Sequence, residues 1–394
     1  MTQTELKQEF IKLYGEGGDI RLFHSPGRVN LIGEHTDYNG GFVFPAALSM
    51  GTTIALRKRD DNIVRMKATD LPDMVTIDLS DLSGYKDLFW GNYQAGVLDE
   101  LKKDGYTLVG CDMLYDDTLP HGGGLSSSAA IQVSTALTFA TLAKEAEGKE
   151  EPVDMVSMAK IGQRSEHNYI GVKCGIMDQF ASAMGKKNHA IFLRCSDLSY
   201  ELVPMEMDGY TLIISNTNKK RGLADSKYNE RRSECEEGLR ILQTVLPDIK
   251  TLSDVSLDDF NKYGKVIENE VVYRRVRHVI TENDRVLKSV DALKAGDMKT
   301  FGTLMNASHD SLRDDYEVTG IELDTLVAEA RNIPGVIGSR MTGAGFGGCT
   351  VTLAKTSATE EFIEKVGKAY EAKIGYAASF YLSTIEDGGH EILL

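Results

Sequence analysis

Cysteine, proline and tryptophan are scarce in this sequence. The 394 residues include 5 cysteines, 8 prolines and 1 tryptophan. No two cysteines form a Cys-x-x-Cys pair, and none lies beside a histidine at metal-ligand spacing. We therefore expect neither a disulfide framework nor a structural zinc site, and we expect a reducing, cytoplasmic location. The neutral interpretation of each cysteine is a buried small apolar residue.

Positive charge is also in short supply. There are 44 Lys and Arg against 59 Asp and Glu, a formal net charge of −15. Broad binding to nucleic acid or to an anionic membrane needs a dense field of basic residues, so both are disfavoured. No apolar run approaches the roughly 18–20 residues of a membrane span, and the first residues lack the pattern of a signal peptide. We expect small-molecule ligands and no obligate protein partner.

Hydrophobic periodicity predicts a folded chain of mixed α+β class. The first half is rich in predicted strands, while the second mixes long helices with a few strands. This indicates two domains, over residues 1–205 and 206–394, packed with a cleft between them. Helices are expected over 1–15, 89–104, 126–147, 153–169, 226–246, 266–294, 298–312, 318–332 and 359–375. Strands are expected over 41–59, near Val64 and Val75, and over 111–115, 211–215 and 349–353.

A glycine–serine loop at 119–130 carries the first chemical signal. It reads Leu-Pro-His-Gly-Gly-Gly-Leu-Ser-Ser-Ser-Ala-Ala and leads into a predicted helix. Successive glycines let the backbone approach a ligand closely, and the start of a helix offers free N–H groups to a phosphate. A serine hydroxyl there can also reach a magnesium ion bound to that phosphate. An ordinary turn with a serine cap accounts for one serine and one glycine, but not for three of each.

A second glycine-rich loop lies at 342–348. Gly343, Gly345 and Gly348 match the dinucleotide fingerprint G-x-G-x-x-G, which must follow a strand and open a helix. Here a predicted strand follows instead, so a dinucleotide-binding fold is disfavoured and a tight connection between strands stays open. The sequence also lacks a P-loop motif and the His-Arg-Asp and Asp-Phe-Gly motifs of protein kinases.

A third polar segment spans residues 25–41 and reads Ser-Pro-Gly-Arg-Val-Asn-Leu-Ile-Gly-Glu-His-Thr-Asp-Tyr-Asn-Gly-Gly. Its carboxylates, imidazole and amides could form hydrogen bonds with a ring of hydroxyls. It could equally be a solvated turn, and taken alone the segment does not decide between the two.

Together, in their order along the sequence (25–41, 119–130 and 342–348), the three segments resemble the signature motifs of the GHMP kinases. The part at 27–39 is similar to the sugar signature of the galactokinases in particular. A fourth segment at 173–180, Lys-Cys-Gly-Ile-Met-Asp-Gln-Phe, resembles the family segment that carries the catalytic aspartate. The resemblance extends from residue 25 to residue 350. It implies a two-domain GHMP kinase fold with the active site between the domains, and ATP-dependent phosphorylation of the anomeric hydroxyl of α-D-galactose.

The resemblance also implies residue roles. Asp178 would accept the proton, and Arg28 would stabilise charge in the transition state. Ser128 and Glu166 would hold Mg²⁺, with ATP as co-substrate. The expected sugar-binding residues are Glu34, His35, Thr36, Asp37, Gly175 and Tyr228. The expected ATP-binding residues are Gly122, Gly123, Gly124, Leu125, Ser126, Ser127 and Ser128 at the phosphates, and Trp90 and Asn92 on the adenine side.

These roles agree with the chemistry of phosphoryl transfer, which asks a protein mainly for positioning, charge neutralisation and a carboxylate base. Without the motifs, a structural ion pair would be the better interpretation of each charged residue. A basic stretch at 218–232 also suggests that Lys220 or Arg221 reaches the phosphates, with a solvated loop as the alternative.

Two alternative functions remain at this point. One is a galactokinase-like sensor that binds sugar and ATP without catalysis. The retained serines at 126–128, with Arg28 and Asp178, favour the enzyme. The other is a kinase for a related sugar such as N-acetylgalactosamine or arabinose, which the segment Glu-His-Thr-Asp at 34–37 disfavours.

Overall fold

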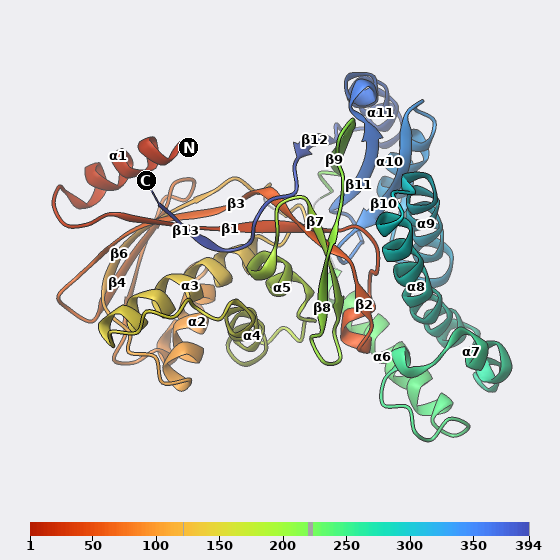
Figure 1. The fold of residues 1–394 in the computed structure, drawn as a ribbon, viewed down its shortest axis with the longest axis horizontal. Coiled ribbons are helices and arrows are strands. Elements are labelled where there is room, and N and C mark those ends of the chain that lie inside the picture. Colours follow the sequence, from red (N-terminus) through yellow and green to blue (C-terminus); the bar gives the residue numbers. More distant parts are fainter. Residues whose placement is uncertain (121, 220–223, 394) are drawn as a thin grey trace.

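The computed structural model describes residues 1–120, 122–219 and 224–393. In it the chain forms two lobes, and the long strands of the first lobe extend toward the second (Figure 1). The α+β class expected from the sequence is confirmed. None of the five cysteines, all of which lie among the described residues, forms a disulfide. Among the described residues, no helix combines the length and apolar character needed to cross a membrane.

The first lobe is built on a six-stranded sheet with helices on both faces. Only β4 and β6 pair in parallel; the other pairs of this sheet are antiparallel. In spatial order its strands are β13 (His390–Ile392), β1 (Arg21–Asn30), β3 (Pro45–Lys58), β6 (Cys111–Asp117), β4 (Ile63–Ala68) and β5 (Met74–Asp78). One face carries α2 (Gly91–Lys103), α3 (Ser127–Ala146), α4 (Met155–Ser165) and α5 (Met177–Met184), and α1 (Gln3–Tyr14) lies on the other (Figure 1).

The alternation of side chains along β1 explains these two layers. Phe23 joins the core beneath α2 and α3, while Leu22 packs with Leu6 and Phe10 of α1. Successive strand residues face opposite sides of a sheet, so one strand can supply both cores. On α3, small residues such as Ala136 and Ala140 are fully buried, which lets its neighbours pack closely.

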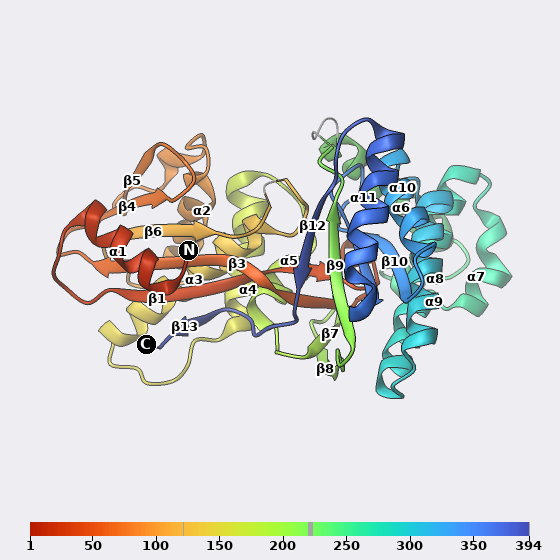
Figure 2. The same ribbon diagram turned by 90° about the horizontal axis from the view of Figure 1, so that it is seen from above.

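The second lobe is an antiparallel four-stranded sheet covered by helices (Figure 2). Its strand order is β10 (Val336–Thr342), β11 (Cys349–Lys355), β9 (Tyr210–Asn216) and β12 (Ser379–Ser383). The helices are α6 (Ala224–Leu242), α7 (Leu257–Tyr263), α8 (Glu270–Lys294), α9 (Met298–Ser311), α10 (Ile321–Arg331) and α11 (Thr359–Ile374). A small sheet of β2 (Phe42–Val43), β7 (His189–Arg194) and β8 (Tyr200–Pro204) completes the fold.

Most helices lie where the periodicity predicts them, but three features were not predicted. The polar segment at 25–41 begins inside β1, whose register shifts between Pro26 and Arg28. The short helices α5 and α7 were missed, and so were the strands β1, β7, β8, β10, β12 and β13. Except for β1, these elements have eight residues or fewer, which hold too few periods for a reliable pattern, and tertiary contacts decide them.

The last residues return from the second lobe to the first. β13 pairs with β1, so that His390 lies opposite His24 and Ile392 opposite Leu22. On the way, the N–H of Gly388 donates to Gly185 O, just beyond α5, at 2.8 Å. Residues 390–392 therefore belong to the first sheet, although they lie in the second predicted domain. The boundary near residue 205 itself stays a prediction.

Gly388→Ala tests how tightly this returning segment is held. A Cβ at Gly388 would lie 2.4 Å from Ala183 O, so the segment or the end of α5 must shift. Overpacking of this kind costs about 1–3 kcal/mol, and we expect a lower urea midpoint. Gly84→Ala is the matched control, because nothing lies within 4 Å of a Cβ there. Equal midpoints for the two variants would show that the segment is loosely held.

Candidate active site

A two-pronged ion pair joins Arg28 on β1 to Asp178 in the first turn of α5. Nε of Arg28 donates to Asp178 Oδ1 at 2.7 Å and Nη2 donates to Oδ2 at 2.8 Å. The guanidinium side chain is 5% exposed and the carboxylate side chain 35% exposed. Paired, charge-assisted hydrogen bonds of this kind fix orientation as well as charge. Asp178 is thus held in one orientation while part of it remains open to a ligand.

The glycine–serine loop is tied to the same pair. Nη1 of Arg28 donates to Gly124 O at 2.8 Å, and the Ser126 hydroxyl donates to Asp178 Oδ2 at 2.6 Å. Ser126 adopts a left-handed conformation with φ 64°, and α3 begins at the next residue. The first N–H groups of a helix have no acceptors within it, so this loop ends on free donors suited to an anion.

The three serines of this loop have three different neighbours. Ser126 contacts Asp178, while the Ser127 hydroxyl donates to Asp117 at the end of β6. Ser128 lies beside Glu166, which begins a π-helical turn after α4. The serines therefore do not form a repeated cap; each supports a different part of the site.

Glu166 is a nearly buried carboxylate. Burial raises its pKa to about 7, the charge of Asp178 adds to the rise, and Gln132 and Ser128 oppose it. A bound cation would relieve this cost of burial. The carboxylate and hydroxyl oxygens are the ligand types that a hard divalent cation prefers, especially when phosphates complete its shell. Within the described residues, no group of three or more His, Cys, Asp or Glu is placed to hold a metal without such a ligand.

The second glycine loop lies directly against the first. A Cβ at Gly343 would be 3.1 Å from Gly124 O, and one at Gly348 would be 3.4 Å from Gly123 O. The loop connects β10 to β11 as a hairpin. The interpretation as a tight connection between strands is therefore confirmed, and the dinucleotide fingerprint is excluded because no helix follows.

The sugar motif folds beside both loops. Glu34 is 2% exposed, and its Oε1 accepts the Gly343 N–H at 2.7 Å and faces Nη1 of Arg340 at 3.5 Å. Burial raises the pKa of Glu34, although Arg340 and Arg28 oppose the shift. Arg340 is fully buried, and its Nη2 has no hydrogen-bond partner among the described residues.

Asp37 lies against Gly175, and both are near Asp178. A Cβ at Gly175 would sit 1.8 Å from Asp37 Oδ2, so only glycine leaves room for this carboxylate. Burial raises the pKa of Asp37 to about 7, and the charge of Asp178 adds to the rise. The ring of Tyr228, on α6, lies 5.7 Å from that of His35. The structure thus gathers most of the predicted sugar-binding residues around the predicted base.

His35 and Thr36 differ from the other predicted sugar-binding residues. Both ring nitrogens of His35 have protein partners, the Tyr38 hydroxyl at 2.8 Å from Nδ1 and Ala344 O at 3.2 Å from Nε2. Thr36 is fully buried, and its hydroxyl donates to Gly33 O and Phe42 O at 2.9 and 2.7 Å. The hydrogen bonds of these two side chains go to other protein groups and stabilise the conformation of the motif.

The predicted adenine side lies at the start of α2. Trp90 packs edge-on against Tyr115 at 5.9 Å, and its indole N–H is buried without a partner among the described residues. The Asn92 amide donates to Lys86 O at 3.3 Å. No contact joins either residue to Arg28 or Asp178 in the described part of the chain. Lys220 and Arg221 lie outside the described residues.

Several supporting residues were missed by sequence reasoning. Glu282 on α8 is fully buried, accepts the Gly33 N–H at 2.8 Å and pairs with Arg285 at 2.7 Å. Arg340 stands only two residues before the second glycine loop, and this proximity was the one available signal. Glu282 sits in a long amphipathic helix where a charged residue reads as part of the solvated face.

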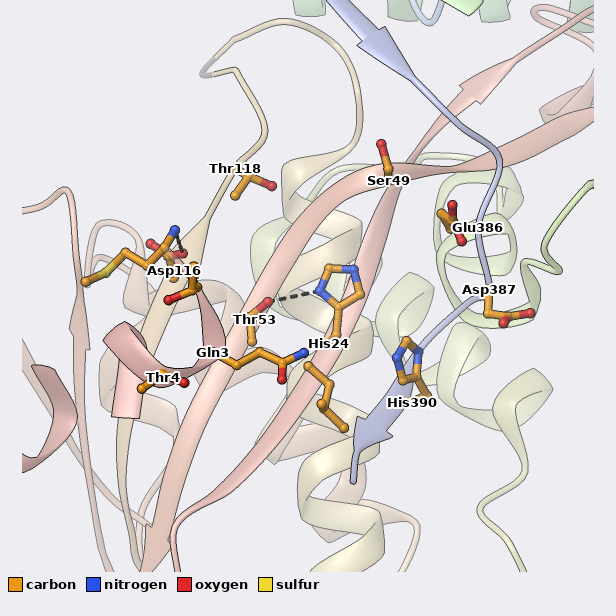
Figure 3. Close-up of a pocket in the computed structure, with 13 residues that line it drawn as sticks. Gln3, Thr4, His24, Ser49, Thr53, Asp116, Thr118, Glu386, Asp387 and His390 are labelled. Carbon is orange, nitrogen blue, oxygen red and sulfur yellow. Dashed lines mark hydrogen bonds and ion pairs between the residues drawn. The ribbon is translucent and has the colours of Figure 1, made fainter. Parts of the chain in front are cut away.

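A separate polar groove of about 740 Å³ lies on the face of the first sheet that also carries α1 (Figure 3). His24 points into it from β1, with Nδ1 3.0 Å from the Thr53 hydroxyl, and His390 faces it from β13. Its neighbour Ser25 points the other way, toward Ser182 of α5. The groove contains none of the predicted site residues.

Comparisons with known families agree with this arrangement. The galactokinase galactose-binding signature matches residues 8–58. The N-terminal domain of GHMP kinases matches residues 92–186, and the C-terminal GHMP kinase domain matches residues 289–372. The three matches contain the sugar motif, the phosphate loop with Asp178, and the second glycine loop respectively.

Individual relatives match over nearly the whole chain. The chain is 50% identical to a galactokinase of Halalkalibacterium halodurans over 95% of its length and 93% of the relative's. It is 47% identical to one of Enterococcus faecalis, covering 98% and 99%. Among solved structures, Lactococcus lactis galactokinase complexed with galactose superposes with a TM-score of 0.93 at 41% identity over both complete chains. Methanococcus jannaschii mevalonate kinase, at 18% identity and a TM-score of 0.66 over 94% and 100% of the chains, shares the fold.

The family expected from the motifs is therefore confirmed. Identities of 41–51% across at least 94% of the chain, with the motif residues brought together as described, leave one assignment. The chain belongs to the galactokinase family of GHMP kinases.

Proposed function

We propose that the protein phosphorylates the anomeric hydroxyl of α-D-galactose with ATP, giving galactose 1-phosphate and ADP for galactose catabolism. The observation that carries the proposal is the junction of Arg28, Asp178 and Ser126. The Asp178 carboxylate accepts hydrogen bonds from Arg28 of the sugar motif and from Ser126 at the end of the phosphate loop. A base placed between an acceptor site and a phosphate site is what transfer to a hydroxyl requires.

In the transfer, the anomeric oxygen forms a bond to the γ-phosphorus while the bond from that phosphorus to the ADP oxygen breaks. The hydroxyl proton passes to the Asp178 carboxylate. Arg28 holds that carboxylate by two hydrogen bonds, so its oxygens keep a fixed direction toward the sugar. The same guanidinium contacts Gly124 O in the phosphate loop, and from there its charge stabilises the negative charge of the transition state.

Sugar recognition in this proposal rests on Glu34, Asp37, Gly175 and Tyr228. Buried carboxylates are strong acceptors for sugar hydroxyls, because the alternative partner, water, is largely excluded. Asp37 is supported by its packing on Gly175 beside Asp178. Tyr228 is supported by its half-buried ring near the sugar motif.

ATP would be held by the loop from Gly122 to Ser128, whose backbone N–H groups and helix terminus suit phosphates. Mg²⁺ held by Ser128 and Glu166 would neutralise phosphate charge. Trp90 and Asn92 would lie on the adenine side. A net charge of −15 is compatible with such a site, because the positive potential is local.

A non-catalytic sensor is the second candidate, and the linked Arg28, Asp178 and Ser126 speak against it. Kinases for N-acetylgalactosamine or arabinose are the third. The test of the proposed function is ADP release with Mg-ATP across these sugars. We expect turnover with galactose well above the other two; release with none of the sugars would favour the sensor.

Asp178→Asn should abolish turnover in the same assay while nucleotide binding survives. The amide cannot accept the proton, and loss of a general base costs about 10²–10⁴-fold. Nucleotide binding, followed by fluorescence titration, should change little because the loop and α3 remain. Asp87→Asn, at an exposed position, is the control. Undiminished turnover by Asp178→Asn would remove Asp178 as the base.

Ser128→Ala should raise the concentration of Mg²⁺ needed for half-maximal activity. The substitution removes one oxygen beside Glu166 and leaves the helix backbone in place. The comparison is with Ser134→Ala on the same helix, where the hydroxyl only donates to Ile131 O. If both variants show the wild-type Mg²⁺ titration, Ser128 is not a ligand.

Asp37 should make the free protein less stable as pH rises. Its pKa is about 7 when folded and near 3.8 otherwise, so the folded state holds the extra proton between these values. The free energy of unfolding should therefore fall from about pH 4 to pH 7 and then level off. Asp37→Asn should reduce this decline and be the more stable protein at pH 8, measured by urea unfolding. A pH profile unchanged by the substitution would contradict the shift.

A further inference from the structure

A row of hydrogen bonds crosses from the second lobe into the sugar motif. It starts at Cys235 on α6, whose Sγ lies 3.1 Å from the Tyr316 hydroxyl at the end of the π-helical turn that follows α9. The Tyr316 hydroxyl lies 2.8 Å from that of Tyr38, which lies 2.8 Å from Nδ1 of His35. Nε2 of His35 is 3.2 Å from Ala344 O in the second glycine loop.

The last contact fixes the direction of every bond in the row. A carbonyl oxygen can only accept, so Nε2 of His35 carries the hydrogen. Nδ1 of the neutral ring then has a lone pair, and the Tyr38 hydroxyl must donate to it. With its hydrogen used, the Tyr38 oxygen accepts from Tyr316, whose oxygen in turn accepts from the Cys235 thiol. Every donor points in the same direction, from Cys235 through the sugar motif to Ala344 O in the second glycine loop.

Burial around the row favours the neutral form of the His35 ring, which this row of hydrogen bonds requires. Tyr316 and Cys235 are fully buried and His35 is 4% exposed. Burial lowers the pKa of His35 to about 3, and His278, Arg231 and Arg340 add to the effect. His35 also has a left-handed backbone with φ 61°, an uncommon conformation that persists where the surroundings hold it.

We propose that His35 is a positioning residue, which fastens the second glycine loop to the sugar motif through its Nε2–H tautomer, and that Tyr38, Tyr316 and Cys235 select that tautomer. Because both ring nitrogens are occupied, the ring has no free donor or lone pair for the sugar. This inference rests on the proposed galactokinase function and changes the role that the motif alone assigns to His35.

Two residues of the row, His35 and Tyr38, pack against Tyr228, which is a proposed sugar contact. The Tyr228 ring lies 5.3 Å from Tyr38 and 5.7 Å from His35, and the His35 ring lies 4.8 Å from Tyr316. The Arg28–Asp178 pair has its own hydrogen bonds and shares none with the row. A break in the row should therefore weaken sugar binding and leave the chemical step largely intact.

The first measurement is the tautomer of His35 itself. In protein labelled with ¹⁵N-histidine, correlation spectra separate a nitrogen that carries hydrogen from one with a lone pair. The His35 signals are those lost in His35→Asn. We expect the Nε2–H form at pH 7, with Nδ1 unprotonated. A Nδ1–H ring or an imidazolium would overturn the proposal, whether or not the protein is active.

The second measurement is kinetic. Tyr38→Phe removes the hydrogen bonds to both His35 and Tyr316, and should raise KM for galactose about tenfold, with kcat and KM for ATP within about twofold. Tyr316→Phe should have a smaller effect, and Cys235→Ser, which keeps a donor, should resemble wild type. Tyr14→Phe, whose hydroxyl donates to Met113 O far from the row, is the control.

The outcomes separate this inference from the proposed function. An unchanged KM for galactose in Tyr38→Phe would overturn the positioning role. A wild type that turns over no sugar would overturn the proposed function, while the tautomer spectrum would still decide the state of His35. Should Tyr38→Phe fail to fold, Tyr316→Phe and the wild-type spectrum provide the decision.

Discussion

The buried guanidinium of Arg28 is the constraint on which the site depends. Its three nitrogens bind Asp178 and Gly124 O, and so join residues 28, 124 and 178 into one unit. An arginine taken out of water needs partners for its donors, and here those partners are the proposed base and the phosphate loop. The contacts that provide partners for the buried guanidinium of Arg28 therefore also orient Asp178 and the phosphate loop.

The same logic orders the carboxylates around the pair. Glu34 is buried against Arg340 and the Gly343 N–H, while Asp37 and Glu166 are raised to a pKa of about 7 by burial close to Asp178. Only Asp178 has a guanidinium bound to both oxygens. The structure thus separates four nearby acids by environment, and one of them is kept in a fixed, partly exposed orientation. For Glu34, Asp37 and Glu166, a bound hydroxyl or cation would offset the cost of burying a charged carboxylate.

Much of this could be predicted from the sequence, for physical reasons that differ by element. Long helices such as α3 and α8 show their periodicity, and the motifs at 25–41, 119–130 and 342–348 name the residues that meet at the site. What the sequence could not provide is the partner of each side chain. That the His35 ring contacts Ala344 O, or that Glu34 accepts a hydrogen bond from Gly343, follows from contacts between residues far apart in the chain. The buried Glu282 shows the same limit, because its helix reads as amphipathic and its partner Gly33 lies 249 residues away.

The returning strand β13 has a mechanical consequence. The chain leaves the first lobe before β9 and comes back after β12 to pair with β1. A wide hinge opening would have to peel this strand from the sheet and draw residues 385–389 out of their contacts with Ala47, Ser182 and Gly185. Each of those steps breaks backbone hydrogen bonds, so large rotations of the lobes carry an energetic penalty that a single linker would not impose. The two lobes are thus connected twice, once before β9 and once through β13, and small displacements of loops leave both connections intact.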